Sequence, residues 1–443
     1  MRNRLTVATY LASSTLSALG NAIAAVALPL LLLAATGSAL GAGVLAVATA
    51  VPSVLAGVLG GALVDRMDRR LASAIADVVS ALALLALPIV DALAGLELGW
   101  FVLFGVLGAI GDVPGMAARE ALSPRIARTV GMPLERLIGL REAGQAIAIV
   151  VGPGVAALLV TGVSTSGVLI VTAVTSTLAA IATLLLPAAV GRPAPRARPD
   201  AAGDPGSVHP VSAHGGADDT TGTAAQPDDG AAGVLAGLRL VLRRGPVRAV
   251  MLLGTGVIAV VGTVQGILLP VHLQASGQPA VLGLALSGLA LGSLLGAGLT
   301  AIIGGRLRRR TIVVLALLAS LPAVVGLSLL PPAAAIVGAA VLLGLVSAPL
   351  GAVLGAALLD SVDDRLHGRV LGAQNAIALV AAPLAIGATS VVIEFAGARV
   401  AGLALAGLWA LVVLVALLSR SIRQVTAGST LEQDPEEDPH AQR

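Results

Sequence analysis

Few side chains that could carry chemistry interrupt the long apolar runs of this sequence, and one of them is Asp112. It lies seven residues before Arg119, about 10 Å into its run if the run is helical. A carboxylate in such surroundings is costly, so it either pairs with a cation or exchanges a proton. We expect Asp112 to pair with Arg69 or Arg70, or to exchange a coupling proton. A permanent ion pair fits the pattern equally well.

Two further acids are candidates for the same chemistry. Asp77 lies one to two turns into the run that follows Arg70, where a latch or an interfacial role is the simpler interpretation. Glu142 stands beside Arg141 at the start of another apolar run, and these two residues could simply pair with surrounding loops. We keep Asp77 and Glu142 as candidates for proton coupling, after Asp112.

The residues that are missing exclude several kinds of site. Without cysteine there are no disulfides, thiolate metal sites or cysteine nucleophiles, and without lysine there is no Walker A loop and no Schiff base. His209 and His214 fit a solvated spacer better than a metal site. The acidic residues Asp360, Asp363 and Asp364 could suggest a magnesium-dependent prenyltransferase, but no second acidic motif accompanies them. We therefore expect no cofactor, no metal and no enzyme activity.

The elements that hold these residues must lie in lipid. The 443 residues are 57% hydrophobic and 12% charged, with a mean hydropathy of +0.97, too apolar for a soluble core. A membrane helix needs about 20 apolar residues. The sequence predicts twelve such spans, at roughly 6–33, 39–63, 72–92, 98–118, 138–160, 166–187, 247–273, 280–304, 311–330, 334–358, 370–392 and 398–419.

The arginines predict how the spans are oriented. With the N-terminus in the cytoplasm, every arginine except Arg399 falls on the cytoplasmic side, as positively charged loops do. An even number of spans then also places the C-terminus inside. The net charge is only +3, and the arginines lie in short loops, so no nucleic-acid partner is expected. The use of Arg in place of Lys, together with much Ala, Gly and Val, suggests a high-GC bacterium. We expect the protein to lie in the inner membrane of that bacterium.

The composition divides the chain into four parts. Residues 1–187 and 233–420 hold six spans each, and the second part begins with an amphipathic stretch at 233–245 that suits a helix lying on the inner leaflet. Residues 188–232, rich in Pro, Gly, Ala and Asp, predict a disordered cytoplasmic linker. Residues 421–443 predict a disordered acidic tail.

Short segments of the two six-span parts resemble one another in the same order. They are 27–37 with 268–277, 65–70 with 305–310, and 145–157 with 375–387, at separations of 241, 240 and 230 residues. The sequence therefore predicts an all-α membrane protein of twelve helices, built as two repeated six-helix bundles. Repeated halves with a site between them are typical of secondary transporters.

The end of the second predicted span carries a motif. Its residues are Gly61, Asp65, Arg66, Arg69 and Arg70 within GALVDRMDRR. This segment resembles the G-x-L-x-D-R-x-G-R-R loop of the major facilitator superfamily, with Asp68 in place of a glycine. The resemblance extends over the whole membrane part and implies a gating loop. Asp65 would lie near the N-terminal end of the eleventh span, where a negative charge is favoured by about 0.3–1 kcal/mol. A role in topology alone stays open for the arginines.

A second resemblance concerns the fifth predicted span. Gly139, Ala148 and Gly152-Pro153 follow the spacing of the antiporter motif G-x8-G-x3-G-P-x2-G-G, although three of its glycines are alanine here. In the family this motif marks exporters, which favours efflux over uptake. The segment 362–376 is similar to the R-G-R-V-x-G pattern of the branch that includes macrolide and siderophore exporters. The small residues could also form close-packed stripes by chance in so Ala- and Gly-rich a chain.

Polar residues on two predicted spans are candidates to line a substrate cavity. On the first span they are Tyr10, Ser13, Ser14, Ser17 and Asn21, and on the seventh they are Thr263 and Gln265. In the family these helices line the central cavity. Hydrogen bonds between helices explain the same residues equally well. Because aromatic residues are so few, we expect shape-tolerant apolar binding of a bulky amphiphile.

Taken together, the residues and the resemblance predict a monomeric exporter of an amphiphilic drug, natural product or siderophore. Its partners would be this small molecule, protons and the lipid bilayer, and it would work by alternating access. A proton-coupled uptake symporter of the same fold is the first alternative. A membrane sensor or enzyme is a more remote one, because the sequence has no signalling or catalytic domain.

Overall fold

The computed structural model describes residues 2–64, 67–162, 165–191, 245–303, 307–362 and 367–420. Every regular element within these ranges is a helix, and twelve helices are long and apolar enough to cross a membrane. Their bounds follow the twelve predicted spans closely. The predicted all-α, twelve-helix architecture is therefore confirmed.

The first half of the chain forms six long helices and two short ones. They are α1 (Arg2–Thr36), α2 (Ala39–Val64), α3 (Arg69–Ala94), α4 (Leu98–Glu120), α5 (Ser123–Val130), α6 (Leu134–Gly162), α7 (Thr165–Leu184) and α8 (Ala188–Gly191). The sequence did not predict α5 or α8, because neither is long enough to cross a membrane. The helix α8 also extends ordered structure past residue 187, where the linker was predicted to begin.

The second half repeats this pattern with one interruption. Its elements are α10 (Gly245–Thr263), the π-helical turn η1 (Val264–Leu268), α11 (Leu269–Ala275), α12 (Pro279–Ile303), α13 (Arg309–Ser328), α14 (Ala333–Asp360), α15 (His367–Ala396) and α16 (Ala398–Leu418). The elements α10, η1 and α11 make up one span. Pro331 and Pro332 lie between α13 and α14, at the boundary expected between the spans 311–330 and 334–358.

Some predicted features lie outside the described residues. They are Asp65 and Arg66 of the motif loop, most of the 188–232 linker, nearly all of the 233–245 amphipathic stretch, and the 421–443 tail. These remain predictions from the sequence.

The two ends of the helices differ in charge. We call the end that holds Arg69, Arg119, Arg309 and the start of α1 the Arg-rich end, and the opposite end the Arg-poor end. Connections at the Arg-poor end are short. Gly397 alone joins α15 to α16, and its φ of 86° is one that glycine adopts without strain. Short apolar turns of this kind leave the Arg-poor end with few charges.

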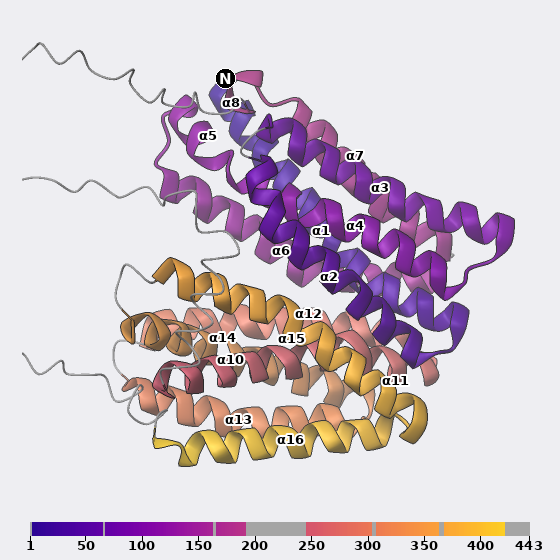
Figure 1. Cartoon of the computed structure of the whole chain (residues 1–443), viewed down its shortest axis with the longest axis vertical. Coiled ribbons are helices and arrows are strands. Elements are labelled where there is room, and N and C mark those ends of the chain that lie inside the picture. Colours follow the sequence, from indigo (N-terminus) through magenta and orange to yellow (C-terminus); the bar gives the residue numbers. More distant parts are fainter. Residues whose placement is uncertain are drawn as a thin grey trace, which may run out of the picture.

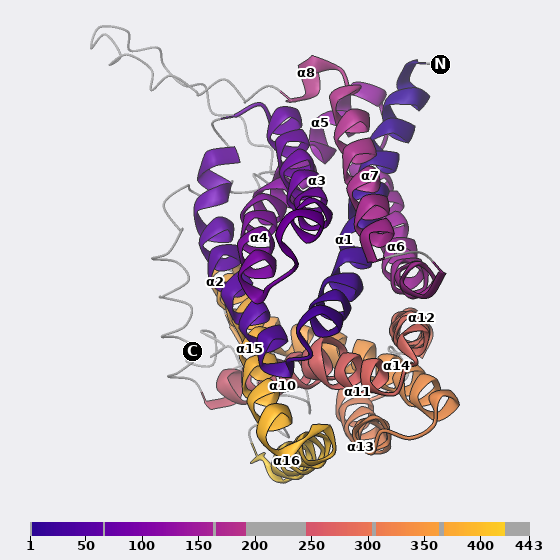
Figure 2. The same ribbon diagram turned by 90° about the vertical axis from the view of Figure 1, so that its right-hand side faces the viewer.

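The helices form two groups in space, one from each half of the chain (Figure 1). Helices α1 to α8 pack among themselves, as do α10 to α16, and the groups meet mainly where α6 contacts α12 and α2 contacts α15. Figure 2 shows α2 beside α15 and α6 beside α12 in the turned view. The chain thus forms two six-helix bundles that meet along two helix pairs, and the predicted pair of bundles is confirmed.

Small residues bring the helices of each bundle together. A Cβ added at Gly292 of α12 would lie 2.2 Å from the carbonyl oxygen of Val341 on α14, and one at Gly296 would lie 2.3 Å from that of Leu345. Backbones at this distance gain van der Waals contact, which drives helix association in lipid. The large apolar side chains are left free to face outward, as Leu93 and Phe395 do, with more than four fifths of their surface exposed.

Candidate functional site

A buried ion pair lies within the first bundle. Arg119 of α4 donates a hydrogen bond from Nη2 to Oδ2 of Asp77 on α3 at 2.5 Å, and each side chain is only 7% exposed. Ser17 of α1 donates to the other carboxylate oxygen at 2.9 Å. Three helices are therefore joined by one carboxylate. Sequence reasoning had counted Arg119 as a loop residue, whereas the structure places it in the last turn of α4.

Asp112 has a different partner. Its Oδ1 accepts a hydrogen bond from the hydroxyl of Ser80 on α3 at 2.5 Å. Ser80 lies one turn along α3 from Asp77, the acid of the buried pair. The structure therefore places Asp112 beside the buried pair, with a neutral hydrogen-bond donor. The expected partners Arg69 and Arg70 contact main-chain carbonyls instead.

Helix periodicity positions this polar cluster, which we define as Ser17, Asp77, Ser80, Asp112 and Arg119. Asp77 and Ser80 are three apart on α3, and Asp112 and Arg119 are seven apart on α4, so each pair shares one helix face. A close approach of α3 to α4 brings the faces together, because a Cβ on Gly115 would lie 2.4 Å from that of Ala76. The seven-residue spacing in the sequence could have identified Arg119 as the partner of an α3 acid.

The residues around the motif loop fix the Arg-rich end of α3. Asp68 is the N-cap of α3 and accepts hydrogen bonds from the backbone N–H groups of Arg70 and Leu71. The carboxylate thus satisfies two of the free amides at a helix start, which explains an acid where the family has glycine. Gly61 lies in the last turn of α2.

The two arginines of this loop bind the ends of neighbouring helices. Arg69 donates from Nη1 to the carbonyl of Ala121 after α4 at 3.1 Å. Arg70 donates to the carbonyl of Leu186 after α7 at 2.6 Å. Cations are favoured at helix C-termini, where carbonyl groups are left without partners. Both arginines therefore hold α3 to its neighbours within the first bundle.

Glu142 forms an ion pair at the Arg-rich mouth of α6. Its Oε1 accepts from Nη2 of Arg141 at 2.6 Å, and Glu120 lies 3.5 Å from the other nitrogen of the guanidinium. The Glu142 side chain is 55% exposed. The pair therefore joins a nearly buried arginine, 10% exposed, to a half-exposed carboxylate at the surface.

Most of the polar stripe of α1 faces into the first bundle. The Tyr10 hydroxyl lies 2.6 Å from the Ser123 hydroxyl, and Tyr10 is fully buried against α4 and α5. Ser13 contacts Thr183 and the carbonyl of Ala179 on α7. With Ser17 bound to Asp77, these three candidates for the substrate cavity are used in helix–helix hydrogen bonds. A helical stripe shows which residues share a face but not what that face meets.

The central cavity lies between the bundles and has a volume of about 700 Å³. Helices α1 and α6 line it from one bundle, and α10, η1, α12 and α14 line it from the other. Its wall is mainly apolar, with Gln265 and Ser293 among its few polar side chains. Thr263, the other candidate of that span, is fully buried outside this lining, and Asn21 is half-buried next to the lining residue Ala22.

The π-helical turn places Gln265 on the cavity wall. Pro270 follows one turn later and lacks the N–H that would bond the carbonyl of Gly266, so the helix widens locally. Gly262 and Gly266, which also line the cavity, pack tightly on Ala382 and Ile386 of α15. Isolated π turns are frequent at functional sites.

The antiporter-like residues lie on two faces of α6. A Cβ on Gly152 would lie 2.5 Å from that of Ala22, so this face packs closely on α1. Pro153 lines the central cavity, and its carbonyl oxygen would lie 2.3 Å from a Cβ on Gly283 of α12. Gly139 is exposed and has no such neighbour. The Gly-Pro pair therefore lies where the two bundles and the cavity meet.

A tight seam joins the bundles at the Arg-poor end. The Leu40 N–H at the start of α2 donates to the Glu394 carboxylate of α15 at 3.1 Å. One turn further, a Cβ on Gly43 would lie 1.9 Å from the Ser390 hydroxyl oxygen. The contact of Gly283 with α6 lies at the same end. Because all these contacts are at the Arg-poor end, the bundles are closed there.

The chemistry available to this arrangement is proton binding and hydrogen bonding. The polar cluster offers two carboxylates, two hydroxyls and one guanidinium on three helices. Among the described residues, no group of three His, Asp or Glu side chains could hold a metal ion. The cavity adds an apolar wall for a bulky ligand.

Comparisons with known proteins agree on one family. The model of the Major Facilitator Superfamily matches residues 10–264 and 251–440. The chain is 28% identical over 413 residues to the multidrug efflux pump Tap of Mycolicibacterium fortuitum, covering 93% of this chain and 94% of that protein. It is 30% identical over 402 residues to the multidrug efflux pump Tap of Mycobacterium tuberculosis strain ATCC 25618 / H37Rv, covering 89% and 88%.

Solved structures share the fold at low sequence identity. The nucleoside transporter NupG, as its D323A mutant, aligns with a TM-score of 0.74 and 12% identity, covering 93% of this chain and 99% of that one. A bacterial homologue of the human lysosomal transporter Spinster aligns with a TM-score of 0.60 and 15% identity, covering 96% and 95%. At these identities the likeness concerns the fold alone.

Proposed function

Because the chain belongs to the major facilitator superfamily, whose members are transporters rather than enzymes, we propose that it exports an amphiphilic small molecule in exchange for protons. The observation that carries this proposal is the mainly apolar cavity between the two bundles. A wall with few polar groups favours shape-tolerant binding of bulky apolar compounds over a single polar nutrient. The relatives named multidrug efflux pumps support the same direction and substrate class.

Alternating access is the proposed mechanism of movement. The bundles touch at the Arg-poor end through Gly43, Ser390 and Gly283, so export requires this seam to part. We propose that residues 1–187 and 233–420 rock as two bodies about the central cavity. The Glu394 carboxylate would release the start of α2 as the seam opens.

The polar cluster is the proposed site of proton coupling. Asp112 is bound by a neutral hydroxyl, which can also donate to or accept from a protonated carboxyl group. Asp77, in contrast, is bound to a permanently charged guanidinium. We therefore assign proton exchange to Asp112 and a positioning role to Asp77. Glu142, half-exposed and paired with Arg141, is the weaker candidate.

We propose that the protein is a monomer in the bacterial inner membrane, with both termini in the cytoplasm. The Arg-rich end would face the cytoplasm, following the distribution of positive charge in short loops. The closed seam would then face outward, and the substrate would reach the cavity from the cytoplasmic side.

Accumulation in an efflux-deficient bacterium tests export. Cells that express the protein should hold less of a macrolide antibiotic or a hydroxamate siderophore than control cells, and a protonophore should abolish the difference. Ala290→Phe, which adds a ring to the cavity wall, should also abolish it, whereas Ala404→Phe on the exposed face of α16 should not. Higher accumulation in expressing cells would contradict export and support uptake.

A further inference from the structure

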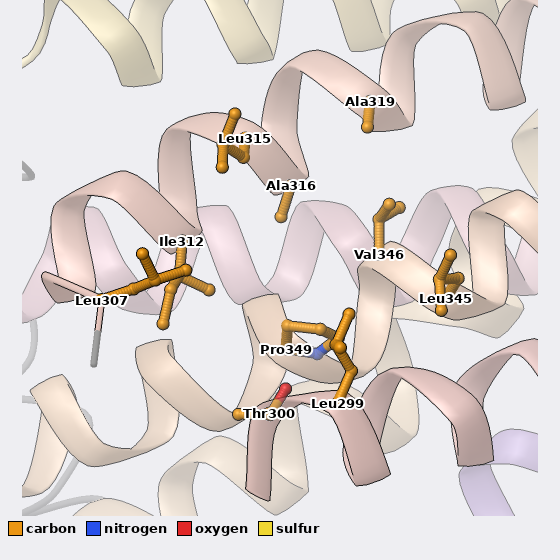
Figure 3. A pocket seen from close by; sticks show the side chains of 10 residues that line it. All are labelled: Leu299, Thr300, Leu307, Ile312, Leu315, Ala316, Ala319, Leu345, Val346 and Pro349. Carbon is orange, nitrogen blue, oxygen red and sulfur yellow. The ribbon is translucent and has the colours of Figure 1, made fainter. Parts of the chain in front are cut away.

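A second cavity lies on the outside of the C-terminal bundle (Figure 3). Helices α12 and α13 both pack against α14, and a cavity of about 210 Å³ lies between them with α14 as its floor. Thr300 is the one polar residue in the lining, and its hydroxyl donates to the carbonyl of Gly296 within its own helix. No lining residue is shared with the central cavity. The two cavities are therefore separate sites.

The surroundings of this cavity face lipid. Leu299, Leu307 and Leu315, which line it, are 46%, 41% and 56% exposed. Exposed leucines on a membrane-spanning bundle contact acyl chains. The cavity begins at the last turn of α12 and the first turn of α13, so it lies at the Arg-rich end. Its opening is thus at the depth where acyl chains meet lipid headgroups.

Positive charge stands directly beside this opening. Three exposed arginines, Arg308, Arg309 and Arg310, lie in sequence between the lining residues Leu307 and Ile312. Arg309 forms an ion pair with Asp360. Arg308 and Arg310 form no ion pair with any residue in the described part of the chain. Two cations at the headgroup level above an apolar slot complement a molecule with an anionic head and a hydrocarbon tail.

We propose that this groove binds an anionic phospholipid of the leaflet at the Arg-rich end. One acyl chain would fill the slot between α12 and α13, and its phosphate would lie against Arg308 and Arg310. A free phosphate has no hydrocarbon chain to bind in the apolar slot. A zwitterionic lipid is attracted less strongly than an anionic lipid to the two arginines. The proposal is independent of the transported substrate and of proton coupling.

Native mass spectrometry of the full-length protein in detergent tests the headgroup contact. Phosphatidylglycerol should bind wild type more tightly than phosphatidylcholine does. Arg308→Gln with Arg310→Gln should weaken phosphatidylglycerol binding about tenfold or more, because each such cation is worth about a fivefold change in affinity. The matched control Arg399→Gln, at the opposite end of the same bundle, should bind like wild type. The double lysine variant R308K/R310K should also retain binding.

A second variant tests the acyl slot. Ala319→Leu fills the cavity from α13 and should weaken phosphatidylglycerol binding without changing any charge, whereas Ala404→Leu on α16 should not. Gel filtration confirms that each variant is folded. Equal binding of the two lipids by wild type, or wild-type binding by either R308Q/R310Q or A319L, would overturn the proposal.

Discussion

The ion pair between Asp77 and Arg119 holds three helices of the first bundle together. Both side chains are almost fully buried, and Ser17 supplies a further hydrogen bond. A buried charge without its partner is far more costly than the intact pair is favourable. Asp77 therefore contributes to stability through its ion pair, which supports the positioning role proposed for it.

Removing one partner of this pair should destabilise the fold. Asp77→Asn leaves the Arg119 guanidinium buried without a counter-charge, so the free energy of unfolding should fall by about 3–5 kcal/mol. Arg119→Gln should do the same, and the double variant D77N/R119Q should recover part of the loss. Unfolding in detergent, followed by tryptophan fluorescence, measures the effect. Single variants as stable as wild type would show that the pair is not formed.

Asp112 differs from Asp77 in a way that the sequence alone could not show. The sequence identified both acids because charges are rare in these helices. It could not show that Ser80 binds one and Arg119 the other, because that depends on how α3 packs on α4. The arginines of the motif loop were the expected partners of Asp112, yet free carbonyls at helix ends bind them.

At the scale of elements, the two halves use the same device at the Arg-rich end. Arg69 begins α3 and donates to the carbonyl after α4, while Arg309 begins α13 and pairs with Asp360 at the end of α14. These arginines are the ones that the alignment of 65–70 with 305–310 places opposite each other. In each half, the arginine that begins one helix therefore binds the C-terminal end of the following long helix.

Glycine at the seam decides how closely α2 and α15 approach. Gly43→Ala would place its Cβ 1.9 Å from the Ser390 hydroxyl oxygen, so the variant should favour the state with the Arg-poor end open. The sequence contains no cysteine, so a single Val47→Cys beside Gly387 reports on this opening. A membrane-impermeant maleimide should label this cysteine several-fold faster in the Gly43→Ala background.

The matched control for this substitution is Gly99→Ala. Gly99 lies near the same end, in α4, with no atom close enough to meet an added Cβ. It should leave the labelling rate unchanged, and Ser390→Gly should partly reverse the effect of Gly43→Ala. Equal labelling in the Gly43→Ala and Gly99→Ala backgrounds would mean that the seam does not control access.

The membrane-spanning helices were predictable from the sequence, because the lipid environment requires them. Elements that depend on packing against other parts of the chain were not. Twelve apolar runs had to become helices, because lipid offers no partner for backbone groups. The short helices α5 and α8 lack this constraint and were missed. The polar stripe of α1 was visible as a helix face, but whether Tyr10 and Ser13 faced the cavity depended on α5 and α7.

At the scale of the whole molecule, the closed seam and the central cavity would correspond to one state of the proposed transport cycle. The seam includes close approaches at Gly43 and Gly283 and one hydrogen bond from the Leu40 N–H to Glu394. A proton or ligand that binds one of two such states more tightly shifts the balance between them. We propose that two events shift this balance, the binding of a proton to Asp112 and the binding of a ligand in the central cavity.

The most direct test of proton-driven export is transport in proteoliposomes with an imposed pH gradient. The protein should move a labelled macrolide against its own gradient when protons flow the opposite way, and should stop when the pH gradient is collapsed. Asp112→Asn, in which the amide oxygen can still accept from Ser80, should fold normally but lose gradient-driven transport while keeping passive exchange. Gradient-driven transport by Asp112→Asn at the wild-type rate, or wild-type transport that ignores the pH gradient, would contradict the account.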